Sequence, residues 1–446
     1  MLESVLVANR GEIARRIIAT ARRLGIRSVA VYSEADADLP FVREADQAVL
    51  IGPPPPAQSY LHSAAVLAAA HQSRARAVHP GYGFLSENAD FARRVLAEGL
   101  IWVGPPPDAI GQMGDKINAR NLMQRAGVPV AMGSTEPVTD ASQALAEAER
   151  IGYPVMVKAA AGGGGIGMSA AAGPEELQTA FETARTRAER FFGSPAILLE
   201  RFLERARHVE VQIMGCSDGQ VVALGERDCS VQRRHQKVAE ETPSPGVSPR
   251  LREALLAAAV RAGETVGYRG AGTVEFLLDV RKQEFVFLEM NTRLQVEHPV
   301  TELVTGIDLV EQQFLVASGE PVSFDPARTA PEGHALEFRV YAEDPVRFLP
   351  SPGAITGWEE PAGPGIRVDA GYEAGNTVTP FYDPLLAKLC VHGPTRDEAL
   401  GRAREAVGAF RVAGPKTNLP LHADLLASEE FISGDYDTSV VAGLRS

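Results

Sequence analysis

The chain has 446 residues, a formal net charge of −13 and 45% hydrophobic residues, enough apolar material for several cores in about three domains. The acidic balance and the lack of an extended basic stripe argue against binding to nucleic acid. The sequence shows no signal-peptide pattern or long apolar span, and Cys216, Cys229 and Cys390 lack metal-ligand spacing. We therefore expect a cytoplasmic protein without a membrane partner.

The N-terminal hundred residues alternate between strand and helix patterns. Residues 4–8 and 28–32 are strand-like, and between them Ile13 and Ile17 recur on one helical face. This alternation favours a doubly wound parallel sheet. The turn-rich loop that carries Tyr82 follows a short strand, and by itself it is best interpreted as a simple connection.

A second region begins near residue 113 and carries features that suit phosphate binding. A strand-like run ends in Lys158 and is followed by the glycine-rich run at 162–167. Glycine allows backbone N–H groups to approach phosphates closely and lets a loop move as a lid. The run lacks the Gly-Lys-Ser/Thr of a Walker motif, and glycines alone fit a flexible linker better.

The next strand-like stretches place polar side chains on one face. Residues 207–214 alternate, so that the two valines should face a core while His208 and Glu210 lie on the opposite face. By spacing alone, His208 is as readily a solvated residue as a ligand-binding one. The run at 232–237 resembles an ordinary solvated basic surface. Cys229 is interpreted as structural, since no base accompanies it.

A β-hairpin is predicted in the middle of the second region. Two apolar, β-branched or aromatic runs are separated by the polar segment 281–284, and a turn near Lys282 places Glu275 directly opposite Glu289. Like charges repel in that position. A divalent cation that bridges to phosphate oxygens is therefore a natural partner, with Asn291 as a neutral oxygen ligand. The plainer alternative is a pair of surface carboxylates on an exposed hairpin.

Beyond this hairpin, polar residues alternate with apolar ones. Arg293, Gln295 and Glu297 could project together, because Leu294 and Val296 separate them. Arginine suits a two-point grip on a planar oxyanion, and bicarbonate is such an anion. Glu297 beside it could serve as a base.

Together these motifs resemble those of biotin carboxylase, the ATP-grasp enzyme that carboxylates biotin in acetyl-CoA carboxylase and related carboxylases. The signature is the segment 289–298, and the resemblance extends over essentially the whole chain. It implies an α/β and α+β protein with three domains. These are a doubly wound Rossmann-like domain at 1–112, an ATP-grasp domain at 113–325 with a glycine-rich mobile lid at about 131–203, and a C-terminal biotin carboxylase domain with a mixed sheet at 331–446.

The resemblance also implies roles for individual residues. ATP binding is expected of Lys116, Lys158, Gly164, Gly165, Glu200, Arg201, Phe202, Leu203, His208, Gln232, His235, Glu275 and Glu289. Two Mg²⁺ or Mn²⁺ ions are expected on Glu275, Glu289 and Asn291, and bicarbonate on Lys237, Arg293, Gln295 and Val296. Biotin is expected beside Tyr82 and Arg339, where Arg339 stabilises the deprotonated ring. The implied catalytic residues are Lys237, Arg293, Arg339 and the base Glu297.

Some residues leave alternatives open. Ile166 stands in the glycine run where the family usually has Arg or Lys, which puts the tightness of lid closure in doubt. Another ATP-grasp ligase, such as a carbamoyl-phosphate or peptide-bond-forming enzyme, would share the lysines, lid and carboxylates, but not the segment 293–298 together with Arg339. A catalytically silent nucleotide-binding subunit is supported only by Ile166. From the residues alone, Arg339 could also simply pair with Glu337 or Asp344.

The partners follow from the same resemblance. The sequence contains no Ala-Met-Lys-Met motif of a biotin-carrying domain, so we expect a free-standing subunit that receives biotin on a separate carrier protein. Carboxyltransferase subunits and a homodimeric partner are implied as well. The reaction would be the first half of acetyl-CoA carboxylation in fatty acid biosynthesis, with propionyl-CoA and pyruvate open as other final acceptors.

Overall fold

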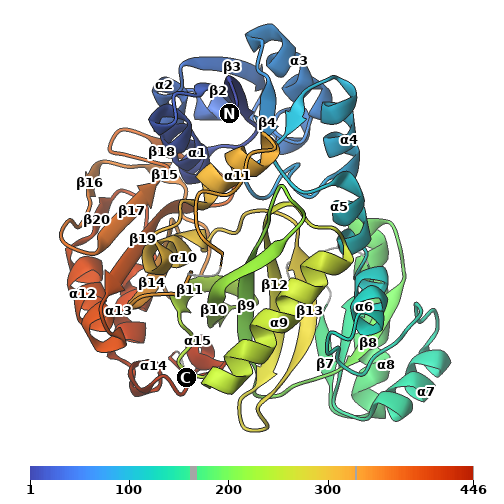
Figure 1. Cartoon of the computed structure of the whole chain (residues 1–446). Coiled ribbons are helices and arrows are strands. Elements are labelled where there is room, and N and C mark those ends of the chain that lie inside the picture. Colours follow the sequence, from blue (N-terminus) through green and yellow to red (C-terminus); the bar gives the residue numbers. More distant parts are fainter. Residues whose placement is uncertain (161–167, 327–328, 445–446) are drawn as a thin grey trace.

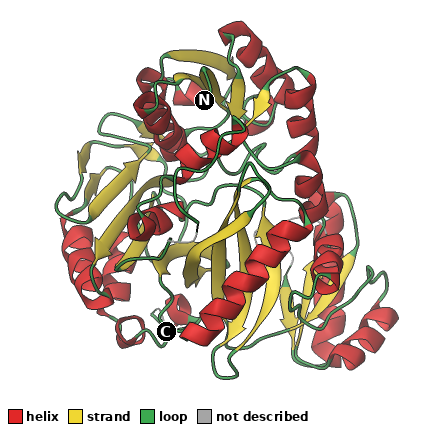
Figure 2. Ribbon diagram, viewed as in Figure 1, coloured by secondary structure: helices red, strands yellow, loops and turns green. Residues whose placement is uncertain are grey.

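The computed structural model describes residues 1–160, 168–326 and 329–444. These residues form a five-stranded, a three-stranded and an eight-stranded sheet, together with two small ribbons of two strands. Helices cover the faces of the sheets (Figure 2). The predicted α/β and α+β class is confirmed.

The N-terminal layer, at the top of Figure 1, is a parallel sheet with the strand order β3-β2-β1-β4-β5. Its strands are β1 Ser4–Val7, β2 Arg27–Ser33, β3 Gln47–Gly52, β4 Ala77–His79 and β5 Ile101–Trp102. Its helices are α1 Gly11–Arg23, α2 Pro40–Glu44, α3 Ser63–Ser73, α4 Ala89–Ala97 and α5 Pro107–Gly114, with short 3-10 turns at Glu34–Asp36 and Pro56–Gln58. The strand order reverses at β1, which is the predicted doubly wound pattern. Ile13 and Ile17 on α1 are buried as expected.

The three-stranded sheet lies at the lower right of Figure 1 and is antiparallel, with the order β7-β6-β8. Its elements, in chain order after α6 Lys116–Arg125, are α7 Ala141–Ile151, β6 Val155–Ala159, β7 Ser169–Ala171, α8 Pro174–Phe192 and β8 Ile197–Arg201. The helices α7 and α8 share a core with these strands. The glycine run that includes Gly164, Gly165 and Ile166 lies outside the described residues.

The eight-stranded sheet has the order β13-β12-β9-β10-β11-β14-β19-β17. Its strands are β9 Arg207–Gly215, β10 Val221–Arg233, β11 Gln236–Thr242, β12 Gly270–Asp279, β13 Glu284–Asn291, β14 His334–Tyr341, β17 Ile366–Ala370 and β19 Leu385–Gly393. Every neighbouring pair is antiparallel, so the C-terminal strands do not form the mixed sheet that the sequence predicts. The sheet also runs without interruption from the central region into the C-terminal region through β11 and β14. The domain boundaries themselves stay predictions.

One face of this sheet packs on α9 Pro249–Thr265, and the other carries polar side chains. Val209 and Val211 of β9 join the core that α9 covers, as their alternation predicts. The close approach requires a glycine, because a Cβ at Gly263 would lie 2.8 Å from a side-chain carbon of Val221. The side chains of β9 between the valines therefore point to the opposite face.

The remaining elements are short helices and strands, of which the helix Leu309–Ala317 packs on β12 and on α1. They are α10 His298–Thr305, α11 Leu309–Ala317, β15 Gly353–Ala354, β16 Gly357–Glu359, β18 Thr377–Val378, α12 Arg396–Ala409, β20 Arg411–Ala413, α13 Leu419–Ala427, α14 Glu429–Ser433 and α15 Val440–Gly443. Helices α12 and α13 pack on β14 and β19, at the left of Figure 1. Among the residues that the structure describes, none of the helices combines the length and apolar character needed to cross a membrane.

Candidate active site

A large cavity of about 1170 Å³ is lined by residues from the N-terminal layer, the three-stranded sheet and the eight-stranded sheet. The predicted site residues that line it are Tyr82, Lys116, Lys158, Glu200, Arg201, Phe202, Leu203, His208, Gln232, His235, Lys237, Glu275, Glu289, Asn291, Arg293, Gln295, Val296 and Arg339. Glu297 lies just behind this lining, fully buried, and contacts Lys237 and Arg339. Gly164 and Gly165 lie outside the described residues. The cavity therefore brings together residues that are far apart in the sequence.

The hairpin β12–β13 has the predicted register. Glu275 pairs directly with Glu289, and a bulge follows immediately after them. The side-chain amide of Asn291 donates to Glu275 Oε1 at 2.8 Å. The two carboxylates and Asn291 all line the cavity, so the hairpin presents them to a ligand rather than to bulk solvent.

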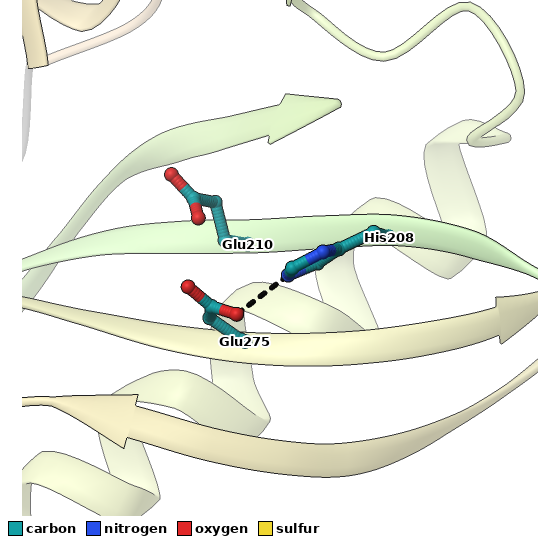
Figure 3. A group of neighbouring side chains, drawn as sticks. All are labelled: His208, Glu210 and Glu275. Carbon is teal, nitrogen blue, oxygen red and sulfur yellow. Dashed lines mark hydrogen bonds and ion pairs between the residues drawn. The ribbon is translucent and has the colours of Figure 1, made fainter. Parts of the chain in front are cut away.

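A second group of three side chains, which shares Glu275 with the first, lies close enough to hold a metal ion: His208, Glu210 and Glu275 (Figure 3). His208 Nε2 lies 2.6 Å from Glu275 Oε2. Burial lowers the pKa of His208, but Glu275 outweighs that effect and the net shift is upward. Lys237 Nζ also lies 2.6 Å from Glu210 and 2.9 Å from Glu275. Because this ammonium already supplies positive charge to the group, we do not interpret it as a metal centre.

Glu289 is the carboxylate that still needs a cation. Within the described part of the chain it makes no hydrogen bond or ion pair, although Lys116 lies near enough to act on it. Burial first, and then the charge of Glu275, raise the pKa of Glu289. A Mg²⁺ ion held by Glu275, Glu289 and Asn291 would relieve this repulsion, and such ions are commonly shared between one or two carboxylates and substrate phosphates. The residues present therefore fit the predicted metal.

Lys237 is at the centre of a buried network of carboxylates. Its Nζ lies 2.6 Å from Glu210, 2.9 Å from Glu275 and 2.6 Å from Glu297. Burial alone would lower the pKa of Lys237, but the surrounding acidic groups raise it well above its ordinary value. The lysine is therefore charged, and it offsets the repulsion between three buried glutamates.

Arg339 extends this network toward the C-terminal strands. Its Nε donates to Glu240 Oε1 at 2.7 Å and its Nη2 donates to Glu297 Oε2 at 3.0 Å. Pairing with Glu337 or Asp344, the simpler sequence alternative, is thus wrong: β14 sits beside β11 and turns the guanidinium toward Glu240. Although burial favours the neutral form of Glu297, Lys237 and Arg339 hold its pKa well below the ordinary range.

Arg293 is fixed by acceptors on three sides. Its Nε lies 2.9 Å from Glu87 Oε2, its Nη1 donates to Gln295 at 3.0 Å and its Nη2 donates to Asn291 Oδ1 at 3.0 Å. Glu87 comes from the loop that also carries Tyr82, in the N-terminal layer. The guanidinium is therefore held in one orientation at the cavity wall.

The other end of the cavity is formed by the three-stranded sheet and α6. Lys158 on β6 forms an ion pair with Glu200 on the neighbouring strand β8. Lys116 begins α6, and burial lowers its pKa. Arg201 ends β8, and Phe202 and Leu203 continue from it along the cavity. Among the residues that the structure describes, these two lysines face the same cavity with one ion-paired carboxylate, Glu200, between them.

The run at 232–237 is a tight hairpin: the turn residues Arg234 and His235 are exposed, whereas the side chain of Gln232 is buried. Strand β10 ends at Arg233 and β11 begins at Gln236, which leaves a two-residue turn at Arg234 and His235. Both turn residues have positive φ, at 49° and 68°, as a type I′ turn requires. The side chain of Gln232 contacts His208 Nδ1 at 2.5 Å, so this hairpin also fixes the histidine.

The sequence missed several residues that support the site: Glu12, Glu87, Glu210, Glu240 and Lys388. Glu210 carried a signal, since the alternation of β9 puts it on the same face as His208. Lys388 carried another, since it is a charged residue within an apolar strand. The other three contact partners from distant elements, which no local pattern specifies.

The chain matches known proteins over nearly its whole length. Family models match at residues 1–110 (biotin carboxylase, N-terminal domain), 115–324 (carbamoyl-phosphate synthase L chain, ATP binding domain) and 337–443 (biotin carboxylase C-terminal domain). Biotin carboxylase 2 of Bacillus subtilis is 51% identical over 438 residues, which cover 98% of each chain. A pyruvate carboxylase subunit of Methanothermobacter thermautotrophicus is 48% identical over 446 residues, 100% of this chain and 90% of that protein.

The fold is also found among solved structures. The biotin carboxylase domain dimer of Hydrogenobacter thermophilus 2-oxoglutarate carboxylase, solved with MgADP, ADP and bicarbonate, superposes with a TM-score of 0.96 at 42% identity. The match covers 99% of this chain and 98% of that one.

Proposed function

The chain belongs to the biotin carboxylase family, and from that premise we propose that it uses ATP and bicarbonate to carboxylate biotin held on a separate carrier protein. The observation that carries the proposal is the position of Glu297. Its two carboxylate oxygens contact Lys237 at 2.6 Å and Arg339 at 3.0 Å. The buried carboxylate of Glu297 thus contacts both Lys237, which is expected to bind bicarbonate, and Arg339, which is expected to lie beside biotin.

ATP is proposed to lie with its adenine beside Arg201, Phe202 and Leu203 and its phosphates toward Lys116 and Lys158. Both lysines line the cavity. Lys158 would exchange its contact with Glu200 for a phosphate oxygen, and Glu200 would then be available to the adenine amino group. Mg²⁺ held by the hairpin carboxylates would neutralise the negative charge that develops on the phosphates during phosphoryl transfer.

Bicarbonate is proposed to lie between Lys237 and Arg293, near the backbone of Val296. Glu297 is ionised, but its contacts with Lys237 and Arg339 make it a weak base. Bicarbonate would compete with Glu297 for the Lys237 ammonium. This competition raises the basicity of Glu297 at the moment when its substrate is bound. Glu297 then accepts the bicarbonate proton while a bicarbonate oxygen attacks the γ-phosphorus and ADP leaves, which gives carboxyphosphate.

The second stage takes place at the Arg339 end of the cavity. Carboxyphosphate breaks down to carbon dioxide and phosphate, and the phosphate accepts the proton of a biotin ureido nitrogen. The charge of Arg339 stabilises the resulting anion, whose nitrogen attacks carbon dioxide and forms carboxybiotin. Tyr82 also lines the cavity, lies within electrostatic range of Arg339, and is proposed to contact the biotin ring. Exclusion of water by the lid would protect the intermediate.

The direct test is ATP hydrolysis by the purified chain with Mg²⁺ and bicarbonate, with and without free biotin, together with transfer of labelled bicarbonate to biotin. Biotin-stimulated turnover that is lost in Arg339→Met supports the proposal. Arg252→Met is the matched control, because Arg252 pairs with Glu226 outside the cavity lining and should leave the stimulation intact. ATP binding without bicarbonate-dependent turnover, also in the presence of a biotinylated carrier protein, would instead indicate a silent nucleotide-binding subunit. Turnover on another carboxylate or amine would indicate a different ATP-grasp ligase.

The finer assignments are also proposals. We propose acetyl-CoA as the first acceptor to test, in fatty acid biosynthesis, by adding carboxyltransferase subunits and comparing acetyl-CoA with propionyl-CoA and pyruvate. A homodimer is supported by the dimeric Hydrogenobacter thermophilus structure and is tested by light scattering. Mn²⁺ in place of Mg²⁺ and a cytoplasmic location remain predictions of the same kind.

A further inference from the structure

Lys388 is a fully buried lysine that the reaction scheme above does not use. It lies on β19 directly opposite Arg339 on β14. Its Nζ donates to the backbone carbonyl of Val296 at 2.9 Å and lies 3.1 Å from Glu12 Oε2. Asp369 is the next acidic neighbour, at 3.8 Å. The lysine therefore contacts elements of all three regions of the chain.

Glu12 continues this connection to the biotin side of the cavity. It lies in the first turn of α1, is buried, and accepts a hydrogen bond from the Tyr82 hydroxyl. Burial raises the pKa of Glu12, whereas the charge of Lys388 opposes that shift. Tyr82, Glu12 and Lys388 thus form a chain of contacts that ends at the Val296 carbonyl.

The carbonyl of Val296 is well placed to affect catalysis. It belongs to the peptide that joins Val296 to Glu297, and Glu297 is the residue that precedes α10. A fixed carbonyl fixes the plane of that peptide and, through it, the backbone of the proposed base. At the other end of this series of contacts, Tyr82 lines the cavity in which biotin is proposed to bind.

We propose that Lys388 and Glu12 are positioning residues. Together they hold Tyr82, on the biotin side, at a fixed distance from the peptide that joins Val296 to Glu297, on the bicarbonate side. The inference rests on the proposed function, because it assigns to Glu12 and Lys388 the alignment of the two stages of that reaction, formation of carboxyphosphate and carboxylation of biotin. Glu12 acts on the biotin side through Tyr82. Lys388 acts on both sides, because it contacts Glu12 and Val296.

A purely structural role is the competing explanation. Buried ion pairs are often no more stabilising than apolar residues of similar volume. Stability by itself therefore does not distinguish the two roles. They differ in kinetics, because a positioning residue changes the Michaelis constant of the substrate on its own side, whereas a structural residue lowers the amount of folded enzyme for every substrate equally.

The experiment measures KM for free biotin, KM for bicarbonate and the ratio of ATP hydrolysed to carboxybiotin formed. Glu12→Gln is expected to raise KM for biotin about 10–100-fold, the effect of losing a hydrogen bond to a charged group, with KM for bicarbonate unchanged. Lys388→Met is expected to raise both constants and the ratio of hydrolysis to carboxylation. Lys388→Arg, which keeps the charge, is expected to restore part of the coupling.

Arg396→Met is the control, because Arg396 forms a partly buried ion pair with the buried Glu241 but does not line the cavity. It should lower stability without changing either KM. If Glu12→Gln leaves KM for biotin unchanged, or changes both constants equally, the inference is wrong. If Lys388→Met does not fold, Glu12→Gln and Lys388→Arg still decide. Failure of the wild-type chain to form carboxybiotin would overturn the proposed function instead, so the two failures are distinguishable.

Discussion

The two ends of the cavity differ in how they balance charge. At the bicarbonate end, Lys237 contacts Glu210 and Arg339 contacts Glu240, and the two cations share Glu297, all at 2.6 to 3.0 Å. At the phosphate end, neither Lys116 nor Glu289 forms an ion pair within the described residues. The bicarbonate end is balanced by the protein itself, whereas the phosphate end has charges that nucleotide and metal would balance.

The largest expected effect tests the bicarbonate end through its base. Glu297→Gln removes the proton acceptor, and biotin-dependent turnover should fall about 10²–10⁴-fold, the usual contribution of a positioned base. Turnover is measured by coupled release of ADP, and ATP affinity is measured in parallel by nucleotide fluorescence. The affinity should change little, because Glu297 contacts the bicarbonate and biotin cations and not the phosphate lysines. A loss of ATP affinity as large as the loss of turnover would contradict the separation of the two ends.

The second prediction compares one lysine from each end. Lys237→Met leaves Glu210, Glu275 and Glu297 buried without their shared cation, and the free energy of unfolding should fall by about 3–5 kcal/mol. Lys116→Met removes no ion pair and should change it by less than about 0.5 kcal/mol. Both values come from urea unfolding in the absence of nucleotide. If both variants lost the same free energy of unfolding, the proposed difference in charge balance between the two ends of the cavity would be wrong.

The third prediction concerns the like charges of the hairpin. Glu289→Gln removes repulsion with Glu275, so the metal-free protein should gain up to about 1 kcal/mol of stability. The Mg²⁺ concentration for half-maximal ATP turnover should nevertheless rise at least about 10–100-fold. That is the usual loss of metal affinity when a residue that only hydrogen-bonds to a metal ligand is removed. Thermal unfolding and a magnesium titration give the two readouts. An unchanged magnesium requirement would mean that the metal binds elsewhere.

The smallest expected effect contrasts two adjacent residues of β11. Burial raises the pKa of Glu240 to about 7 despite Arg339, whereas hydrogen bonds from His334 and Arg396 outweigh burial and lower the pKa of Glu241 to about 2. The stabilising contribution of protonated Glu240 is present below its unfolded pKa of about 4.3 and is lost as the pH rises through about 7. That of Glu241 is present above about 4.3 and is lost as the pH falls toward 2.

The dependence of the free energy of unfolding on pH is obtained from urea unfolding at several pH values. Relative to Glu240→Gln, the wild type should lose stability between about pH 4.5 and 7, by at most about 1.4 kcal/mol per pH unit. Relative to Glu241→Gln, it should lose stability only below about pH 4.5. If the wild type instead gained stability over Glu240→Gln between about pH 4.5 and 7, the charge of Glu240 would be controlled more strongly by Arg339 than by burial.

Local patterns predicted the elements well. The alternation of β9 and the apolar runs of the hairpin specify which side chains share a face, and a turn near Lys282 sets Glu275 opposite Glu289. These features depend on the period of a strand and on the length of one turn. They are the parts of the site that residues close in sequence determine.

Contacts between distant elements could not be read in the same way. Arg293 reaches Glu87 across 206 residues, and Arg339 reaches Glu240 across 99, through strand neighbours that packing selects. The nearby carboxylates suggested Glu337 for Arg339, but the order of strands in the sheet decided otherwise. The hairpin turn at Arg234 and His235 was likewise hidden, because turns of this type usually contain Asn or Gly.

The uninterrupted eight-stranded sheet determines where the protein can be divided into fragments that still fold. A fragment that stops near residue 331 would retain β11 but lose β14, and the unpaired edge from Ala239 to Thr242 would be free to bind another chain and aggregate. The parts on either side of this seam must therefore be inherited and engineered as one piece. The three-stranded sheet shares no strand pairing with the large sheet among the described strands, which makes it the segment best suited to exchange between relatives.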